Sequence, residues 1–200
     1  MRWNLCLIVD SNLKHVRLGI NSRQGNVPKP YLRCPGDVFC VYKVDQTHRD
    51  WPSISFIQEK QYTDVVIALG INHCCHGSAS QDKAISDLQN LYTEYRRSLP
   101  GVRLYFVNVP PSLNLRTSLN AIRFNSQMAM ILQSLNVPVV EVPGILFAGD
   151  GTLDPAFARS NELEQGFPHN RKLHLNREGQ SMVVYKIKRT LCVTANMRMR

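Results

Sequence analysis

Short apolar runs rich in β-branched residues alternate along this chain with longer segments of helical periodicity, and this alternation most strongly constrains the fold. The apolar runs predict strands over residues 5–9, 37–44, 64–69, 102–109 and 138–142. Helical spacing predicts helices over residues 12–20, 82–99, 118–135 and 177–192. The runs are apolar at consecutive positions, which is typical of strands buried on both faces of a parallel sheet. We therefore predict a doubly wound α/β fold with helices on both faces of the sheet.

The length and composition are those of one globular domain. The chain has 200 residues, of which 44% are hydrophobic and 20% charged, so we predict a single domain over residues 1–200. The apolar stretch over residues 3–9 is too short for a secretory signal, because Asp10, Asn12 and Lys14 follow it at once. No segment approaches the roughly 18 apolar residues that a membrane helix needs. We therefore expect an intracellular, cytoplasmic protein with no membrane partner.

The cysteines suggest two hypotheses to test against the sequence, a disulfide framework and a metal site. The six are Cys6, Cys34, Cys40, Cys74, Cys75 and Cys192. Their scattered positions, two of them within predicted strands, favour free thiols in a reducing compartment over disulfides. The segment His73-Cys74-Cys75-His76 holds four ligand types, but contiguous residues cannot all turn toward one ion, and no second pair stands at zinc spacing. We therefore predict neither a metal nor another cofactor.

Polar residues follow two of the predicted strands and precede the last predicted helix. Asp10-Ser11-Asn12 follows the first strand, Gly70-Ile71-Asn72 follows the third, and His174-Leu175-Asn176 stands before the last helix. In an open parallel sheet the ligand crevice lies beyond the carboxyl ends of the strands, so the first two segments open onto the same edge. A hydroxyl nucleophile, an amide donor and an imidazole base are the parts of a site that cleaves esters.

These three blocks, in this order and at these separations, resemble the signature blocks of the SGNH (GDSL-type) hydrolases. The resemblance runs from Val9 to the terminal helix and implies a flavodoxin-like three-layer α/β/α fold around a central five-stranded parallel sheet. It implies that Ser11 attacks an acyl carbonyl and that His174 takes the serine proton. Asn72, in one block with Gly70, would help to hold the oxyanion. The implied activity is that of a serine esterase or deacetylase, acting without a cofactor on a small acyl ester or an acylated glycan.

The chain departs from the family pattern at the position that supports the histidine. The family usually carries an aspartate three residues before the histidine, and here that residue is Arg171. An arginine can neither orient an imidazole nor stabilise its cation. Asp154 is our candidate for the missing acid, and a Ser-His dyad is the other reading. The further carboxylates of the preceding loop that stay open are Asp150, Glu162 and Glu164.

The basic balance of the chain supports a second hypothesis from a different class. A formal charge of +9 makes a polyanion a plausible ligand, so the chain could be an inactive, Oskar-like SGNH domain that binds RNA. The basic residues that would serve it are Lys14, Arg17, Arg171, Lys172, Arg177, Lys186, Lys188 and Arg189. No RNA-recognition signature with interleaved aromatic residues accompanies them. Arg171 favours this binding hypothesis, whereas the joint presence of Ser11, Asn72 and His174 favours the esterase.

Overall fold

Five parallel strands form one sheet in the computed structural model, which describes residues 4–10, 13, 38–43, 51–76, 78–164 and 172–194. The strands are β1 (Asn4–Val9), β2 (Val38–Lys43), β3 (Asp64–Ala68), β4 (Arg103–Val107) and β5 (Val139–Val140). Their order is β2-β1-β3-β4-β5, and all four pairings are parallel. This is the flavodoxin-like order, whose direction reverses beside β1. The predicted sheet is confirmed, with strand ends that differ by at most two residues.

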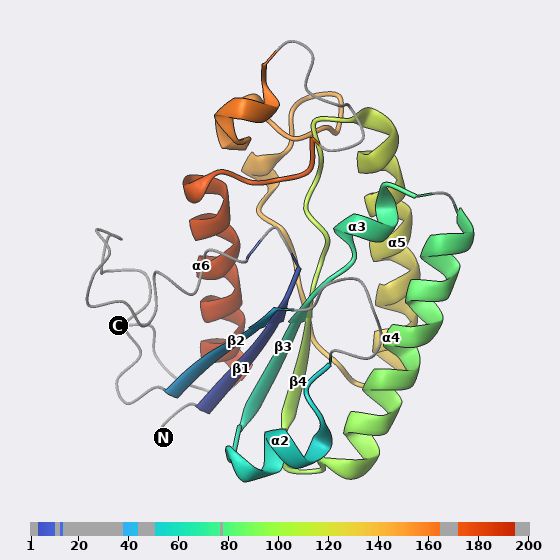
Figure 1. The fold of residues 1–200 in the computed structure, drawn as a ribbon, viewed down its shortest axis with the longest axis vertical. Helices are drawn as coiled ribbons and strands as arrows, with labels where there is room; N and C mark the ends of the chain where they lie inside the picture. The colour runs from blue at the N-terminus through green and yellow to red at the C-terminus, as the bar shows by residue number, and fades with distance from the viewer. Residues whose placement is uncertain are drawn as a thin grey trace.

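Helices cover both faces of this sheet, as Figure 1 shows. The α-helices are α2 (Ile54–Glu59), α3 (Ile71–Cys74), α4 (Ser78–Ser98), α5 (Leu115–Ser134) and α6 (Arg177–Thr194). Three short 3₁₀ helices are η2 (Gly144–Leu146), η3 (Pro155–Phe157) and η4 (Ser160–Glu162). Helix α6 lies on one face, and α4 and α5 lie on the other (Figure 1). Among the described helices, none combines the length and apolar character that a membrane span needs.

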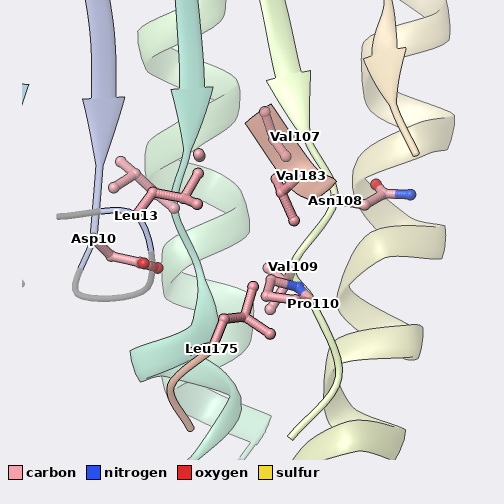
Figure 2. Close-up of a pocket in the computed structure, with 10 residues that line it drawn as sticks. Asp10, Leu13, Val107, Asn108, Val109, Pro110, Leu175 and Val183 are labelled. Atoms are coloured by element: carbon pink, nitrogen blue, oxygen red, sulfur yellow. The ribbon is translucent and has the colours of Figure 1, made fainter. Parts of the chain in front are cut away.

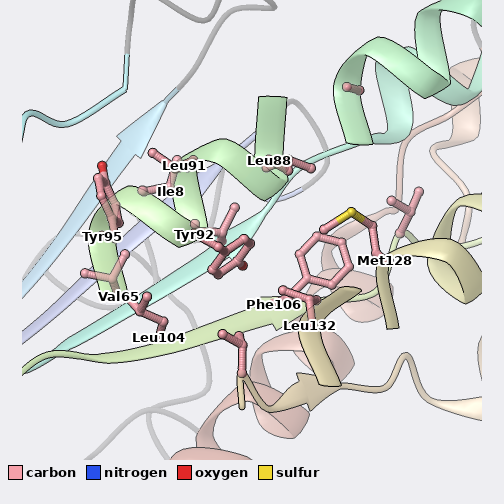
Figure 3. Close-up of a cluster of buried hydrophobic side chains, with 14 of the residues drawn as sticks. Ile8, Val65, Leu88, Leu91, Tyr92, Tyr95, Leu104, Phe106, Met128 and Leu132 are labelled. Atoms are coloured by element: carbon pink, nitrogen blue, oxygen red, sulfur yellow. The ribbon is translucent and has the colours of Figure 1, made fainter. Parts of the chain in front are cut away.

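Alternate side chains of the strands enter two separate cores. Ile8, Ile67 and Phe106 pack with residues of α4 and α5, as the close-up of that core shows in part (Figure 3). Their neighbours in sequence, such as Leu7 and Val66, pack instead with residues of α6. All five residues of β3 are buried. The continuous apolarity of the predicted strands is therefore explained by burial on both faces.

Asparagine caps determine where two of the long helices begin. The Asn114 side chain accepts a hydrogen bond from the backbone N–H of Thr117 at 3.0 Å, so α5 begins at Leu115 rather than at the predicted residue 118. The Asn176 side chain accepts one from the N–H of Gly179 at 3.0 Å and caps α6 in the same way. The predicted helix over residues 12–20 lies outside the described residues, and the short helices α2 and α3 were not predicted.

Gly70 is required where β3 passes into α3. Its φ of 133° lies in a region that L-amino acids rarely adopt. A Cβ added at Gly70 would stand 2.7 Å from a methyl carbon of Val109 and 2.8 Å from the Phe124 ring. The close packing of this turn against the loop after β4 and against α5 therefore admits no side chain.

We expect Gly70→Ala to lower the free energy of unfolding by about 1–3 kcal/mol, because the methyl group meets two buried side chains in a strained backbone. Urea unfolding followed by circular dichroism measures the change. Gly149→Ala is the matched control, since a Cβ there meets nothing within 4 Å, and we expect it to stay within about 0.5 kcal/mol of the native value. Equal stability of the two variants would contradict this account of Gly70.

Candidate active site

A buried carboxylate supports the histidine that the sequence singled out. Glu162, at the end of η4, is 1% exposed, and its Oε1 lies 2.5 Å from Nδ1 of His174. Its other oxygen, Oε2, accepts the backbone N–H of His174 at 2.9 Å. An ionised carboxylate can only accept hydrogen bonds, so Nδ1 carries the proton and Nε2 is the basic nitrogen of the neutral ring. This is the arrangement in which an acid orients an imidazole for proton transfer.

A short antiparallel pairing holds these two residues against each other. Ala158 pairs with Leu175, and the N–H of Arg159 donates to the carbonyl of His174 at 3.2 Å. On the other side of the bridge, the N–H of Asn176 donates to the carbonyl of Phe157 at 2.7 Å. If the pairing continued, a backbone carbonyl of the opposite segment would accept the N–H of His174. The chain turns into η4 at this point, so the carboxylate of Glu162 accepts that N–H instead.

The histidine segment is also tied to the loop that follows β4. The carbonyl of Lys172 accepts hydrogen bonds from the hydroxyl of Ser112 at 2.7 Å and from the N–H of Leu113 at 3.2 Å. Leu173 and Leu175 are buried in the two opposite cores, so the half-buried His174 stands between two anchored side chains. The position of the imidazole is therefore set by both faces of the sheet.

Asp10 links the first block to the third. This carboxylate follows β1 directly, is 6% exposed, and accepts the N–H of Ile71 at 3.3 Å through Oδ2. Its own N–H donates to the carbonyl of Ala68 at 3.2 Å. The bond joins the end of β1 to the start of α3, where the orphan N–H groups of a helix need acceptors. The sequence offered Asp10 as part of a motif but assigned it no role.

Asn72 lies in α3 and is half-buried. Its carboxamide makes no hydrogen bond to any residue that the structure describes, so the amide N–H groups are available to a ligand. The carbonyl of Cys74 at the end of the same short helix accepts the Asn120 amide at 2.9 Å. Gly70 serves α3 as its N-terminal residue, and its carbonyl accepts the N–H groups of His73 and Cys74.

A small, mostly apolar pocket opens between these segments at the carboxyl ends of β1, β3 and β4 (Figure 2). Asp10 and Leu13, the described residues that flank positions 11 and 12, line it together with Leu175, the neighbour of His174. Figure 2 shows the Asp10 carboxylate directed toward the other lining side chains. The remaining lining residues are Ala68, Leu69, Val107, Asn108, Val109, Pro110 and Val183.

Several predicted site residues lie outside the described residues. These are the nucleophile candidate Ser11 and the basic residues Lys14, Arg17 and Arg171. The blocks on either side of the pocket are nevertheless brought together, because residues next to Ser11 and next to His174 line one pocket.

The acid that contacts His174 is Glu162 rather than our candidate Asp154. The carboxylate of Asp154 accepts the N–H of Ala156 at 2.9 Å and caps η3. Asp150 is likewise engaged by Thr152, whose hydrogen bonds lower the pKa of its carboxyl. Nothing in the sequence separates Glu162 from the other carboxylates of the loop, because its burial follows from the fold alone.

The basic residues proposed for RNA differ in exposure. Lys188 is 8% exposed, so most of this side chain is buried against the core under α6. Lys172 and Lys186 are half-buried, whereas Arg177 and Arg189 are exposed at opposite ends of α6.

The segment His73-Cys74-Cys75-His76 does not converge on a common point. Nδ1 of His73 pairs with the Ser80 hydroxyl at 3.2 Å, and the Cys75 thiol donates to the carbonyl of Ile71 at 3.1 Å. Burial, with the Asp10 charge as a smaller contribution, raises the pKa of Cys75 to about 12. Burial raises the pKa of Cys74 as well. Within the described residues, no group of three or more His, Cys, Asp or Glu side chains could hold a metal ion.

We expect the Cys75 thiol to react slowly with iodoacetamide in the folded protein, because a raised pKa keeps it protonated at pH 8. Only about one thiol in 10⁴ is then a thiolate, roughly a thousandfold less than in the unfolded chain. Peptide mass spectrometry after timed labelling, with and without urea, measures the ratio of rates. The folded-state rate should rise about tenfold for each pH unit between pH 8 and 10. Equal labelling rates in the folded and unfolded chains would contradict the expectation.

Comparison with known proteins places this geometry in a fold class. No protein-family profile matches the sequence, and no curated protein matches it significantly. A GDSL-like lipase from Bacteroides thetaiotaomicron is similar in structure, with a TM-score of 0.68 and 14% identity over 96% of this chain and 88% of the lipase. An acetylxylan esterase from Geobacillus stearothermophilus has a TM-score of 0.61 and 15% identity over 94% and 93% of the two chains.

A second acetyl xylan esterase matches 94% of this chain and 99% of its own, with a TM-score of 0.58 and 11% identity. At such low sequence identity, the structural similarity of these proteins to the chain establishes its fold alone. The chain has the fold of the SGNH (GDSL-type) hydrolases, at 11–15% sequence identity to these structural neighbours. What it does must then be argued from the site.

Proposed function

We propose that this protein is a serine hydrolase of small acyl esters, with Ser11 as nucleophile, His174 as general base and Glu162 as the supporting acid. One observation carries the proposal: a buried carboxylate is hydrogen bonded to Nδ1 of His174 next to a pocket lined by the neighbours of Ser11. A carboxylate bonded to Nδ1 orients the imidazole and stabilises the imidazolium that forms when Nε2 accepts a proton.

The mechanism follows from the assignment of the ring protons. Nε2 of His174 takes the hydroxyl proton of Ser11 as the serine oxygen attacks the acyl carbonyl, and Glu162 stabilises the imidazolium that forms. The carboxamide of Asn72 and the backbone amide of Ser11 hold the oxyanion. The imidazolium then gives its proton to the departing alcohol oxygen, which leaves an acyl-serine. Water attacks that ester with His174 again as base, and the imidazolium then returns this proton to the Ser11 oxygen as the carboxylic acid leaves.

The pocket favours a small acyl group. Its lining is mostly apolar, with side chains such as Leu13, Val109 and Leu175 closing around the ends of the strands. Its small size argues against a long acyl chain, so we propose a short acyl group such as acetyl, with the alcohol part of the ester outside. The two acetylxylan esterases of the same fold cleave acetyl groups from a glycan, which supports an acetylated sugar as the substrate class.

We expect Ser11→Ala to reduce hydrolysis of p-nitrophenyl acetate by at least about 10³-fold, because the nucleophile is lost. Release of p-nitrophenol at 405 nm measures the rate, and thermal unfolding verifies that the variant is folded. Ser126→Ala is the matched control: Ser126 is an exposed serine of α5, and its removal should leave the rate within about twofold. Equal turnover by native protein and Ser11→Ala would remove Ser11 from the mechanism.

Glu162→Gln should lower kcat by about 10²–10⁴-fold, because a neutral amide neither fixes the tautomer of His174 nor stabilises its cation. The control is Asp154→Asn, which keeps a capping side chain for η3 and leaves His174 untouched, so its kcat should stay within about threefold. Steady-state kinetics of both variants on the same ester provide the measurement. A larger loss in Asp154→Asn than in Glu162→Gln would transfer the supporting role to Asp154.

A further inference from the structure

Arg159 stands directly opposite His174 in the short antiparallel pairing. Ala158 pairs with Leu175, and the hydrogen bond from the N–H of Arg159 to the carbonyl of His174 extends this register by one residue. Residues that face each other in an antiparallel pair project to the same side, with Cβ atoms about 4.5–5.5 Å apart. Arg159 therefore projects to the same side of the pairing as the imidazole that the proposed mechanism uses.

The guanidinium of Arg159 has no counter-ion among the described residues. It takes part in none of the ion pairs there, and its Nη2 is buried without a hydrogen-bond partner. Three carboxylates of this segment are engaged elsewhere: Asp150 by Thr152, Asp154 by the N–H of Ala156, and Glu162 by His174. A buried cationic donor without an acceptor is costly, so such a group is a strong candidate for binding an external anion.

We propose that Arg159 forms a subsite for a carboxylate on the alcohol part of the ester substrate. The inference rests on the proposed function and names its substrate class, an acyl ester of an acidic alcohol such as a sugar acid. His174 protonates the leaving alcohol in the proposed mechanism, so its cross-strand neighbour lies on the side of the alcohol and not of the acyl group. The planar guanidinium presents paired N–H groups that match the two oxygens of a carboxylate.

Binding of the carboxylate also changes the electrostatics of the base. An unpaired guanidinium near the imidazole opposes the imidazolium that forms when Ser11 attacks. A substrate carboxylate neutralises that charge at the moment of the reaction. Acidic esters are therefore favoured over neutral esters twice, once in binding and once in the chemical step.

The test compares 4-acetoxybenzoate with its neutral methyl ester, two acetate esters whose alcohol parts bear a carboxylate and an uncharged methyl ester at the same position. For each protein, kcat/KM is measured by ultraviolet detection of the released phenol, and the ratio of the two values is the readout. We expect the native ratio to favour the carboxylate, and Arg159→Met to lower the ratio about tenfold or more. Arg159→Lys keeps the charge but loses the paired donors, and its ratio should lie between the two.

Arg189→Met is the matched control, because it removes the same charge from an exposed position at the far end of α6. Its ratio should equal the native one. The proposal is overturned if Arg159→Met keeps the native ratio, or if Arg189→Met lowers it equally, which would reveal a general effect of net charge. Thermal unfolding of Arg159→Met shows whether the variant is folded. Because the readout is a ratio of two kcat/KM values, a loss of activity that affects both esters equally cancels.

A binding measurement keeps the carboxylate subsite testable even if the protein hydrolyses neither ester. Isothermal titration of the Ser11→Ala protein with 4-hydroxybenzoate and with methyl 4-hydroxybenzoate compares the two alcohol parts without a reaction. We expect the carboxylate to bind more tightly, and Arg159→Met in the same background to raise its Kd about tenfold. Equal Kd values for both compounds, or for both proteins, would overturn the proposal. Absence of hydrolysis together with tight carboxylate binding would refute the proposed reaction while retaining the subsite.

Discussion

Burial of the central strands on both faces is the constraint from which the arrangement of the site follows. Strands β1, β3 and β4 send alternate side chains into two apolar cores, one under α4 and α5 and one under α6. Such strands have no exposed face on which polar residues could act, so chemistry is confined to their ends. Asp10 and Asn108 directly follow β1 and β4 and line the pocket, and Gly70 follows β3 two residues after its end.

The Glu162–His174 pair brings a carboxylate to the histidine from a distant position of the chain. The position three residues before the histidine is occupied by Arg171. A carboxylate twelve residues before His174 reaches it instead, because an antiparallel pairing brings the segment before η4 alongside the segment before α6. The same pairing sets Arg159 opposite His174. This short pairing thus brings Glu162 into contact with the imidazole and places Arg159 opposite His174, and in our proposals these two groups govern proton transfer and substrate charge respectively.

The sequence predicted the strands and their parallel sheet, but it did not show which side of each helix is buried. The strands are short apolar runs whose periodicity is local, so their existence and their parallel arrangement could be inferred. In α5, the apolar Ile122 is 45% exposed, whereas Ala121 and Phe124 face the core. A helix with apolar residues on several sides offers more than one stripe, and packing decides which one is buried. The helices α2 and α3 escaped prediction because six and four residues carry too little periodicity.

The sequence by itself determined the alternation of the strands with the long helices α4, α5 and α6, and it marked His174 and Asn72 as polar residues near the ends of elements, because both depend on patterns between near neighbours. It could not choose among the carboxylates of the loop before His174, since all of them are acidic residues of one polar segment. Only the tertiary structure decided that Glu162 is buried against His174 while Asp154 caps η3. The reason is physical: contact between residues far apart in sequence depends on the path of the chain between them, and local preferences do not specify that path.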